Sequence, residues 1–165
     1  MTTAALLPAE GAPLEQDFME GMYLTFDLAN EGYGLEIRHV TEIIGIQEIT
    51  AVPDLPPYMI GVLNLRGKII PVIDVRLRFH LPRRDYDERT CIVVVHVNDD
   101  TMGLVVDKVS EVIDIPQSEI EPAPATGRKA KHYIRAMGKI GQQVKLLLDI
   151  EALMGDEEVP EMVPA

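Results

Sequence analysis

Two stretches of the sequence decide the fold: YLTFDLANEGYGL at residues 23–35 and IVVVHVNDDTMGL at residues 92–104. At a constant offset of 69 residues, their apolar strand formers, the polar turn between them and a final Gly-Leu pair fall into register. With two short insertions the match continues as far as Phe79 and Met154. Such internal similarity indicates a duplicated structural unit. We therefore expect two copies, at residues 22–79 and 91–154, joined by a linker at residues 80–90.

Each copy is predicted to consist mostly of strands. In the first copy, residues 23–28 are rich in strand formers, and the turn residues 30–32 lead into a second strand at 33–37, which is a hairpin pattern. A β-branched stretch at 40–46, a proline-bearing loop and a last strand ending at Asp74 follow. The second copy repeats this order: residues 92–97, 98–101, 102–106, 109–115 and a strand ending at Asp149. Short strands at close spacing favour a small barrel, because closure removes exposed sheet edges.

Helix is expected only in short segments. The candidates are residues 57–62, 76–79 and 151–154. Asp74 and Asp149 stand just before the last two segments, at the position where an aspartate side chain caps a helix. Pro71 lies inside the last strand of the first copy, so we expect that position at a sheet edge or a bulge.

The net charge of −12 is concentrated at the two ends of the chain. Residues 1–21 and 155–165 contain prolines and uncompensated acids, which predicts acidic solvated tails. The body from Gly21 to Ile150 has 18 acidic and 15 basic residues, so nucleic acid is not an expected partner. No apolar run approaches the roughly 20 residues of a membrane helix, and no signal-peptide pattern opens the chain. We expect a cytoplasmic protein without direct membrane insertion.

Residues able to support catalysis or to bind a metal are scattered. Cys91, the single cysteine, opens an apolar run and is expected to be a buried strand thiol. The four histidines show no metal-ligand spacing: His39, His80, His96 and His132. No phosphate-binding loop or nucleophile elbow is present, which predicts no enzyme activity, no cofactor and no metal site. The charged linker and the basic stretch at 128–132 are expected to be solvated loops, although the latter could also contact an acidic partner.

The two copies differ most in chemistry at one turn. Asn64-Leu65-Arg66-Gly67 in the first copy corresponds to Lys139-Ile140-Gly141-Gln142 in the second. Asparagine and glycine suit a tight turn, so turn formation accounts for part of the segment. An arginine presented on such a turn, however, offers a planar fork of donors suited to a carboxylate. Glu42 is the expected intramolecular partner of Arg66.

The sequence around this turn resembles a known family. The run from Ile60 to Arg76, IGVLNLRGKIIPVIDVR, is similar to the signature of CheW-type chemotaxis coupling proteins. Further similarities occur in the order found in that family: Tyr33-Gly34-Leu35, Val40 with Glu42 and Ile43, residues 103–107 and residues 147–149. The resemblance covers residues 22–154.

The resemblance implies a mainly β fold of two SH3-like five-stranded barrels that share a core, with no catalytic activity. It implies two partners, the cytoplasmic tip of a chemoreceptor and the regulatory domain of a CheA-type histidine kinase, and recruitment to membrane receptor arrays. The residues expected to bind a partner near the groove between the lobes are Val40, Glu42, Ile43, Asn64, Leu65, Arg66 and Gly67. Among them, Val40, Ile43 and Leu65 are expected to be apolar anchors.

Two alternatives remain open. One is a CheW-like adaptor in a pilus or gliding pathway, which nothing in the sequence distinguishes from a chemotaxis adaptor. The other is a small-molecule-binding barrel, which needs a convergent set of polar groups that the sequence does not reveal.

Overall fold

The computed structural model describes residues 20–122 and 133–155. Nearly all of both acidic tails and the basic stretch at 128–132 lie outside these residues. Within them, no helix is long and apolar enough to cross a membrane.

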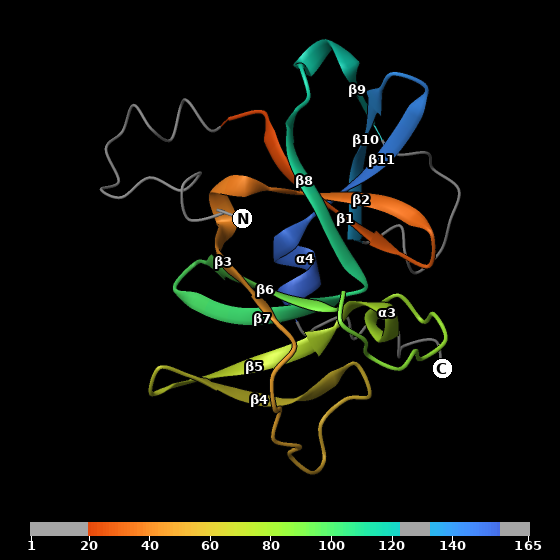
Figure 1. Ribbon diagram of the computed structural model, residues 1–165. Coiled ribbons are helices and arrows are strands. Elements are labelled where there is room, and N and C mark those ends of the chain that lie inside the picture. The colour runs from red at the N-terminus through yellow and green to blue at the C-terminus, as the bar shows by residue number, and fades with distance from the viewer. Residues whose placement is uncertain (1–19, 123–132, 156–165) are drawn as a thin grey trace, which may run out of the picture.

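The described chain forms two β-sheets with a few short helices (Figure 1), which confirms the expected mainly β fold. The first sheet has the order β8-β1-β2-β11-β10-β9, with β1 at Met22–Leu28, β2 at Glu31–Glu36, β8 at Lys108–Asp114, β9 at Ile120–Pro122, β10 at Ile134–Ile140 and β11 at Gln143–Leu148. The second has the order β3-β6-β7-β5-β4, with β3 at Val40–Gly45, β4 at Met59–Leu65, β5 at Lys68–Asp74, β6 at Cys91–Val97 and β7 at Asp100–Val106. The helical segments are η1 at Ile37–His39, α3 at Val75–Arg78, η2 at Gln117–Glu119 and α4 at Ile150–Met154.

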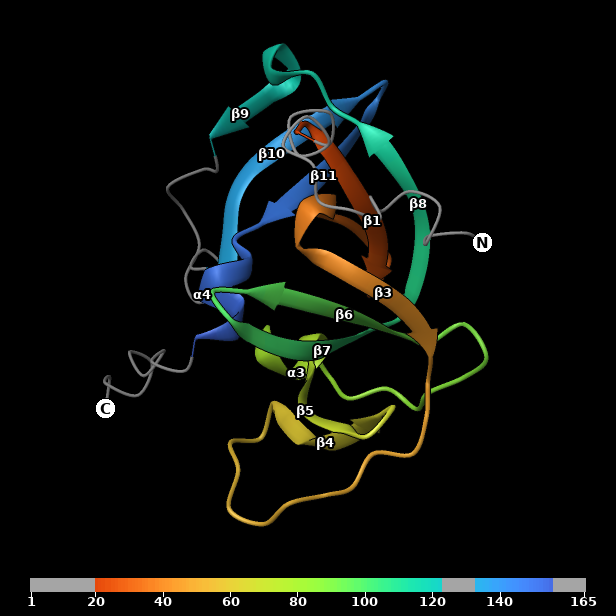
Figure 2. The same cartoon turned by 90° about the vertical axis from the view of Figure 1, so that its left-hand side faces the viewer.

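The sheets do not coincide with the two sequence copies, because each copy gives strands to both sheets. The β1–β2 hairpin of the first copy pairs with β8 and β11 of the second. The β6–β7 hairpin of the second copy pairs in turn with β3 and β5 of the first. Figure 2 shows β3 passing from the upper sheet to the lower one. The two lobes are therefore intertwined, and neither is built from one copy alone.

In each sheet a short stretch of chain brings the two end strands together, as in a small barrel. In the second sheet, Thr50 follows β3 and exchanges two backbone hydrogen bonds of 2.9 Å with Val62 of β4. In the first sheet, β8 and β9 are the end strands, and only residues 115–119 separate them. The two copies thus close their sheets in equivalent ways.

The hairpin turns are tighter than the sequence suggested. β1 and β2 are joined by Ala29 and Asn30, with φ values of 50° and 69°, rather than by residues 30–32. The corresponding turn between β6 and β7 is Asn98-Asp99, with φ values of 53° and 69°. Two central residues with positive φ match the right-handed twist of the flanking strands. Asparagine and aspartate tolerate this conformation because their side chains are short and polar.

Two of the three expected helices are confirmed with their caps. The carboxylate of Asp74 accepts a hydrogen bond from the backbone N–H of Arg76 in α3, and Asp149 accepts one from Ala152 in α4. The expected helix at residues 57–62 is wrong, since β4 begins there. Gly61 in this strand has φ of +147°, outside the helical region.

Pro71 was expected at a sheet edge or a bulge, and it lies at neither. β5 lies between β7 and β4 inside its sheet, and the bulge of the β4–β5 pairing falls at Ile60, whereas Pro71 pairs regularly with Val62. The parallel β5–β7 ladder begins one residue later, at the pair Val72 and Gly103. Pro71 therefore precedes that ladder, where its missing N–H is tolerated.

The main core is shared by both lobes. A chain of aromatic contacts runs from Phe26 through Tyr33 and Phe79 to Tyr133, with ring centroids 5.5 to 5.8 Å apart. The buried guanidinium of Arg78 lies 3.9 Å from the ring centroid of Tyr58 and 5.1 Å from that of Tyr133. These two tyrosines are counterparts in the two copies, so the arginine joins equivalent points of both.

Candidate partner-binding site

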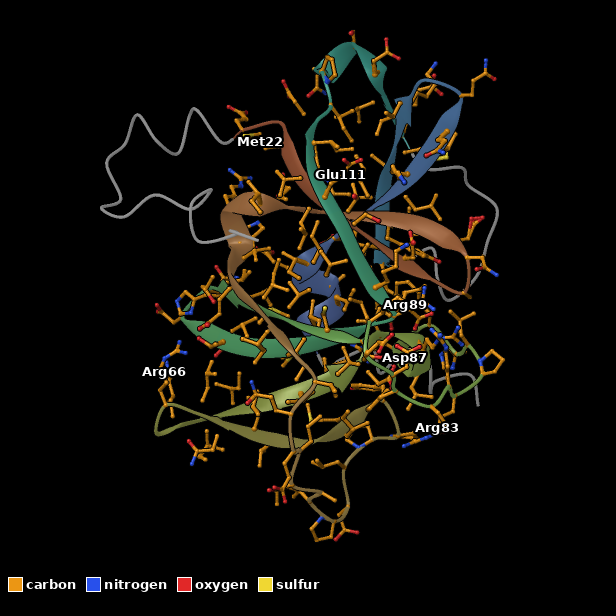
Figure 3. All side chains as sticks on the ribbon, in the orientation of Figure 1. Met22, Arg66, Arg83, Asp87, Arg89 and Glu111 are labelled. Carbon is orange, nitrogen blue, oxygen red and sulfur yellow. The ribbon has the colours of Figure 1, made fainter. Side chains whose placement is uncertain are left out.

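The β4–β5 hairpin carries the segment at which the copies differ. Its two turn residues, Arg66 and Gly67, have φ values of 52° and 88°. The Asn64 side chain accepts a 2.9 Å hydrogen bond from the backbone N–H of Gly67. Asparagine and glycine therefore form the turn, as the sequence predicted, and Arg66 is presented at its tip (Figure 3).

Arg66 pairs with Glu42, the expected partner. The guanidinium donates to both carboxylate oxygens, through Nη1 at 3.4 Å to Oε1 and through Nη2 to Oε2. The hydrogen bond to Glu42 raises the pKa of Arg66. The arginine side chain is 68% exposed and that of Glu42 29%, so donors remain accessible at the surface. β3 and β4 are the two end strands of the second sheet. Because Glu42 lies on β3 and Arg66 on the turn after β4, the ion pair links the two ends of this sheet.

The second copy shows what this turn requires without the arginine. Gly141 occupies the position of Arg66 with a similar φ of 63°. A left-handed conformation is unfavourable for most L residues and is free for glycine. Lys139, the counterpart of Asn64, pairs instead with Glu121 of the neighbouring strand at 3.0 Å. The turn geometry alone therefore favours glycine over arginine at position 66.

The remaining expected site residues do not share one exposed surface. Val40 is only 2% exposed and packs in the main core, which corrects its expected part as an apolar anchor. Ile43 is half-buried against the same core, whereas Leu65 is half-buried against the core of the second sheet. Val40 is too buried to contact a partner and contributes by supporting β3. Ile43 and Leu65 each expose part of a side chain that a partner could contact.

Several apolar side chains that the sequence did not single out are, like Ile43, half-buried against the main core. They come from β1, β6 and β8: Met22, Cys91, Val109 and Val112. Cys91 pairs across the sheet with Gly45 of β3. Its thiol is half-buried rather than fully buried, and burial raises its pKa. Contiguous exposed apolar patches are a feature of protein-binding surfaces.

The linker is anchored by its surroundings rather than simply solvated. The hydroxyl of Tyr86 donates a 2.7 Å hydrogen bond to Asp74. Nearby, Asp107 accepts hydrogen bonds from Nε of Arg76 at 2.9 Å and from the backbone N–H of Ala29 at 3.0 Å. Burial opposes ionisation of Asp107, yet the hydrogen bond from Arg76 leaves its pKa below the ordinary value. These long-range contacts tie the β1–β2 turn to α3, which follows β5.

Comparison with known proteins identifies the family. The model of the CheW-like domain matches residues 22–158. The chemotaxis protein CheW of Klebsiella aerogenes is 38% identical over 138 residues, which cover 83% of each chain. The chemotaxis protein CheW of Bacillus subtilis is 32% identical over 142 residues, covering 86% of this chain and 91% of the relative.

The fold has a solved counterpart. The crystal structure of the scaffolding protein TtCheW from Thermoanaerobacter tengcongensis superposes with a TM-score of 0.78 at 34% identity. The match covers 82% of this chain and 93% of that chain. The names of these relatives agree with the expected non-catalytic role in chemotaxis. The chain belongs to the family of proteins with a CheW-like domain.

Proposed function

We propose that the protein is a non-catalytic adaptor that couples the cytoplasmic tip of chemoreceptors to a CheA-type histidine kinase. Its place of action would be the cytoplasm, at membrane receptor arrays. The single observation that carries the proposed partner site is Arg66, exposed and held by Glu42 at a turn position where the other copy has glycine. A residue retained in an unfavourable conformation points to a role beyond the fold.

An adaptor of this kind needs two separate surfaces. Ile43 and the other half-buried apolar side chains of β1, β6 and β8 suit the apolar stripe of a receptor helix. The outer strands of the lobes suit packing against a similar barrel of the kinase. Arg66 would set the register of binding, because charged groups contribute more to specificity than to affinity.

A pull-down with purified receptor signalling fragment and kinase tests this proposal. Arg66→Glu is expected to reduce capture of at least one partner while the circular dichroism spectrum stays unchanged. Lys139→Glu, at the corresponding hairpin of the second copy, is the matched control and should matter less. Equal losses from both variants, or normal capture by Arg66→Glu, would contradict the assignment.

Glu42→Gln separates two ways in which Arg66 could act. If the guanidinium contacts the partner directly, the amide variant should retain most of the binding. If the arginine acts by fixing the β3 strand through Glu42, the amide variant should lose as much binding as Arg66→Glu. Capture of the receptor fragment and capture of the kinase are therefore both measured with this variant.

A further inference from the structure

The repeat exposes a second difference between the copies, in the first sheet rather than at the Arg66 turn of the second sheet. Val105 of β7 and Ile60 of β4 pack in one apolar cluster of the second sheet. Their counterparts in the first sheet are Glu36 and Arg135, which form an ion pair of 2.9 Å. Both Ile60 and Arg135 occupy the bulge of their strand. The fold therefore accommodates an apolar pair at these positions and does not require charges.

Glu36 is the centre of a charged cluster. Besides Arg135, its carboxylate lies 3.1 Å from Nε2 of His39 and 3.5 Å from Nη2 of Arg38. The hydrogen bond with His39 is the main reason that the pKa of Glu36 falls to about 2, although burial opposes this. The side chains of Arg38 and Arg135 remain 50% and 43% exposed. A guanidinium has five N–H donors, so both arginines keep donors for a further acceptor.

These arginines open onto a hollow of about 460 Å³. The buried Tyr23 lines its wall. Electrostatic interactions with Arg135, Glu36 and Arg38 contribute to the pKa of its hydroxyl. Among residues 20–122 and 133–155 this hydroxyl has no hydrogen-bond partner. Burial raises its pKa, so at neutral pH it is a donor. The hollow falls within the usual volume range of small-molecule sites, roughly 300–1,000 Å³.

The sheet order separates the basic groups of the hollow from Asp114. Glu36, Arg38 and Arg135 come from β2, η1 and β10, on one side of β1. Asp114 comes from the end of β8, on the other side of β1, where it pairs with Met22. Glu20, two residues before β1, also lines the hollow. Neither acid forms an ion pair with another described residue. A lone anion would face these acids and a lone cation would face the arginines, so neither fits well.

We propose that this hollow is a binding site for a small zwitterion, an α-amino-carboxylate in chemical class. Its carboxylate would accept hydrogen bonds from Arg38, Arg135 and Tyr23, and its ammonium group would face Glu20 and Asp114. Carboxylate recognition by arginine is the geometry that its planar donor fork provides. The site shares Met22 with the proposed apolar adaptor surface, but neither Arg66 nor Glu42 lines the hollow.

The test is a titration of the full-length protein with L-alanine, followed by the backbone amide resonances of residues around the hollow. Acetate and ethylammonium, which each carry one of the two charges, are the ligand controls. We expect saturable shifts with L-alanine and binding at least about tenfold weaker for either control, in line with the loss of a charge-assisted hydrogen bond.

The repeat also supplies the decisive variant. The double change Glu36→Val and Arg135→Ile installs the apolar pair of the second sheet and should abolish the L-alanine shifts in a folded protein. Lys139→Gln, which breaks an ion pair of the same lobe outside the hollow, should leave them unchanged. Absence of saturable shifts in the wild type, equal binding of acetate, or full binding by the double variant would overturn the proposal. If the double variant fails to fold, Arg135→Gln replaces it, with at least tenfold weaker binding expected and unchanged binding refuting the site.

Discussion

Arg66→Gly separates what the β4–β5 turn needs from what a partner needs. The substitution gives this turn the glycine that the second copy carries at Gly141, with φ values of 52° and 63° at the two positions. A left-handed conformation costs an L residue about 1–2 kcal/mol, which glycine avoids. Against this, glycine adds about 0.4–1 kcal/mol of entropy to the unfolded chain. The exposed ion pair with Glu42 contributes little to stability.

These opposing effects nearly cancel. We therefore expect the melting temperature of Arg66→Gly to stay within about 3 °C of the wild type, the shift that roughly 1 kcal/mol produces in a domain of this size. Capture of receptor or kinase in the pull-down should nevertheless fall. Thermal unfolding followed by circular dichroism and the pull-down are run on the same preparation.

Two results would refute this reasoning. A fall of about 10 °C in the melting temperature would show that the fold itself depends on the arginine. Unchanged capture of both partners would remove Arg66 from the binding site. The reciprocal variant Gly141→Arg is the control, and it should lower the melting temperature slightly while leaving capture unchanged.

Three further predictions concern the fold. Gly61→Ala should strongly lower the midpoint of urea unfolding, because the new Cβ would lie 2.1 Å from the backbone carbonyl oxygen of Thr50. Gly45→Ala is the control and should have little effect, because a Cβ at Gly45 would have no atom within 4 Å. Similar midpoints for the two variants would contradict this prediction. Because the pKa of Glu36 is depressed to about 2, its ionised form stabilises the fold above the ordinary value of 4.5, and this contribution is lost as the pH falls towards 2. Glu36→Gln should therefore flatten the dependence of the unfolding free energy on pH in that window, and an unchanged slope would argue against the cluster. Either repeat copy expressed alone should remain unfolded by circular dichroism, while the mixed copies should regain strand signal; a folded single copy would disprove the intertwined arrangement.

Features of the candidate site were predictable where they depend on near neighbours or on comparison of the copies. The turn at Asn64 and Gly67 follows from residue type, and the charge of Glu42 makes it a natural partner of Arg66. Burial of Val40 was not predictable, because an apolar strand residue can face either side of a sheet. The ion pair of Glu36 and Arg135 was missed because the two residues lie 99 positions apart in the chain.

The sequence by itself determined the repeat, the mainly β composition, the hairpins and the aspartate caps of both short helices. These features depend on local residue order, since turn, strand and cap preferences act within a few residues. The exchange of strands between copies was decided only by the tertiary structure. Because the two copies carry similar strands, pairing within a copy and pairing between copies satisfy the same apolar pattern. Packing around the shared core, over long sequence distances, selects the second arrangement.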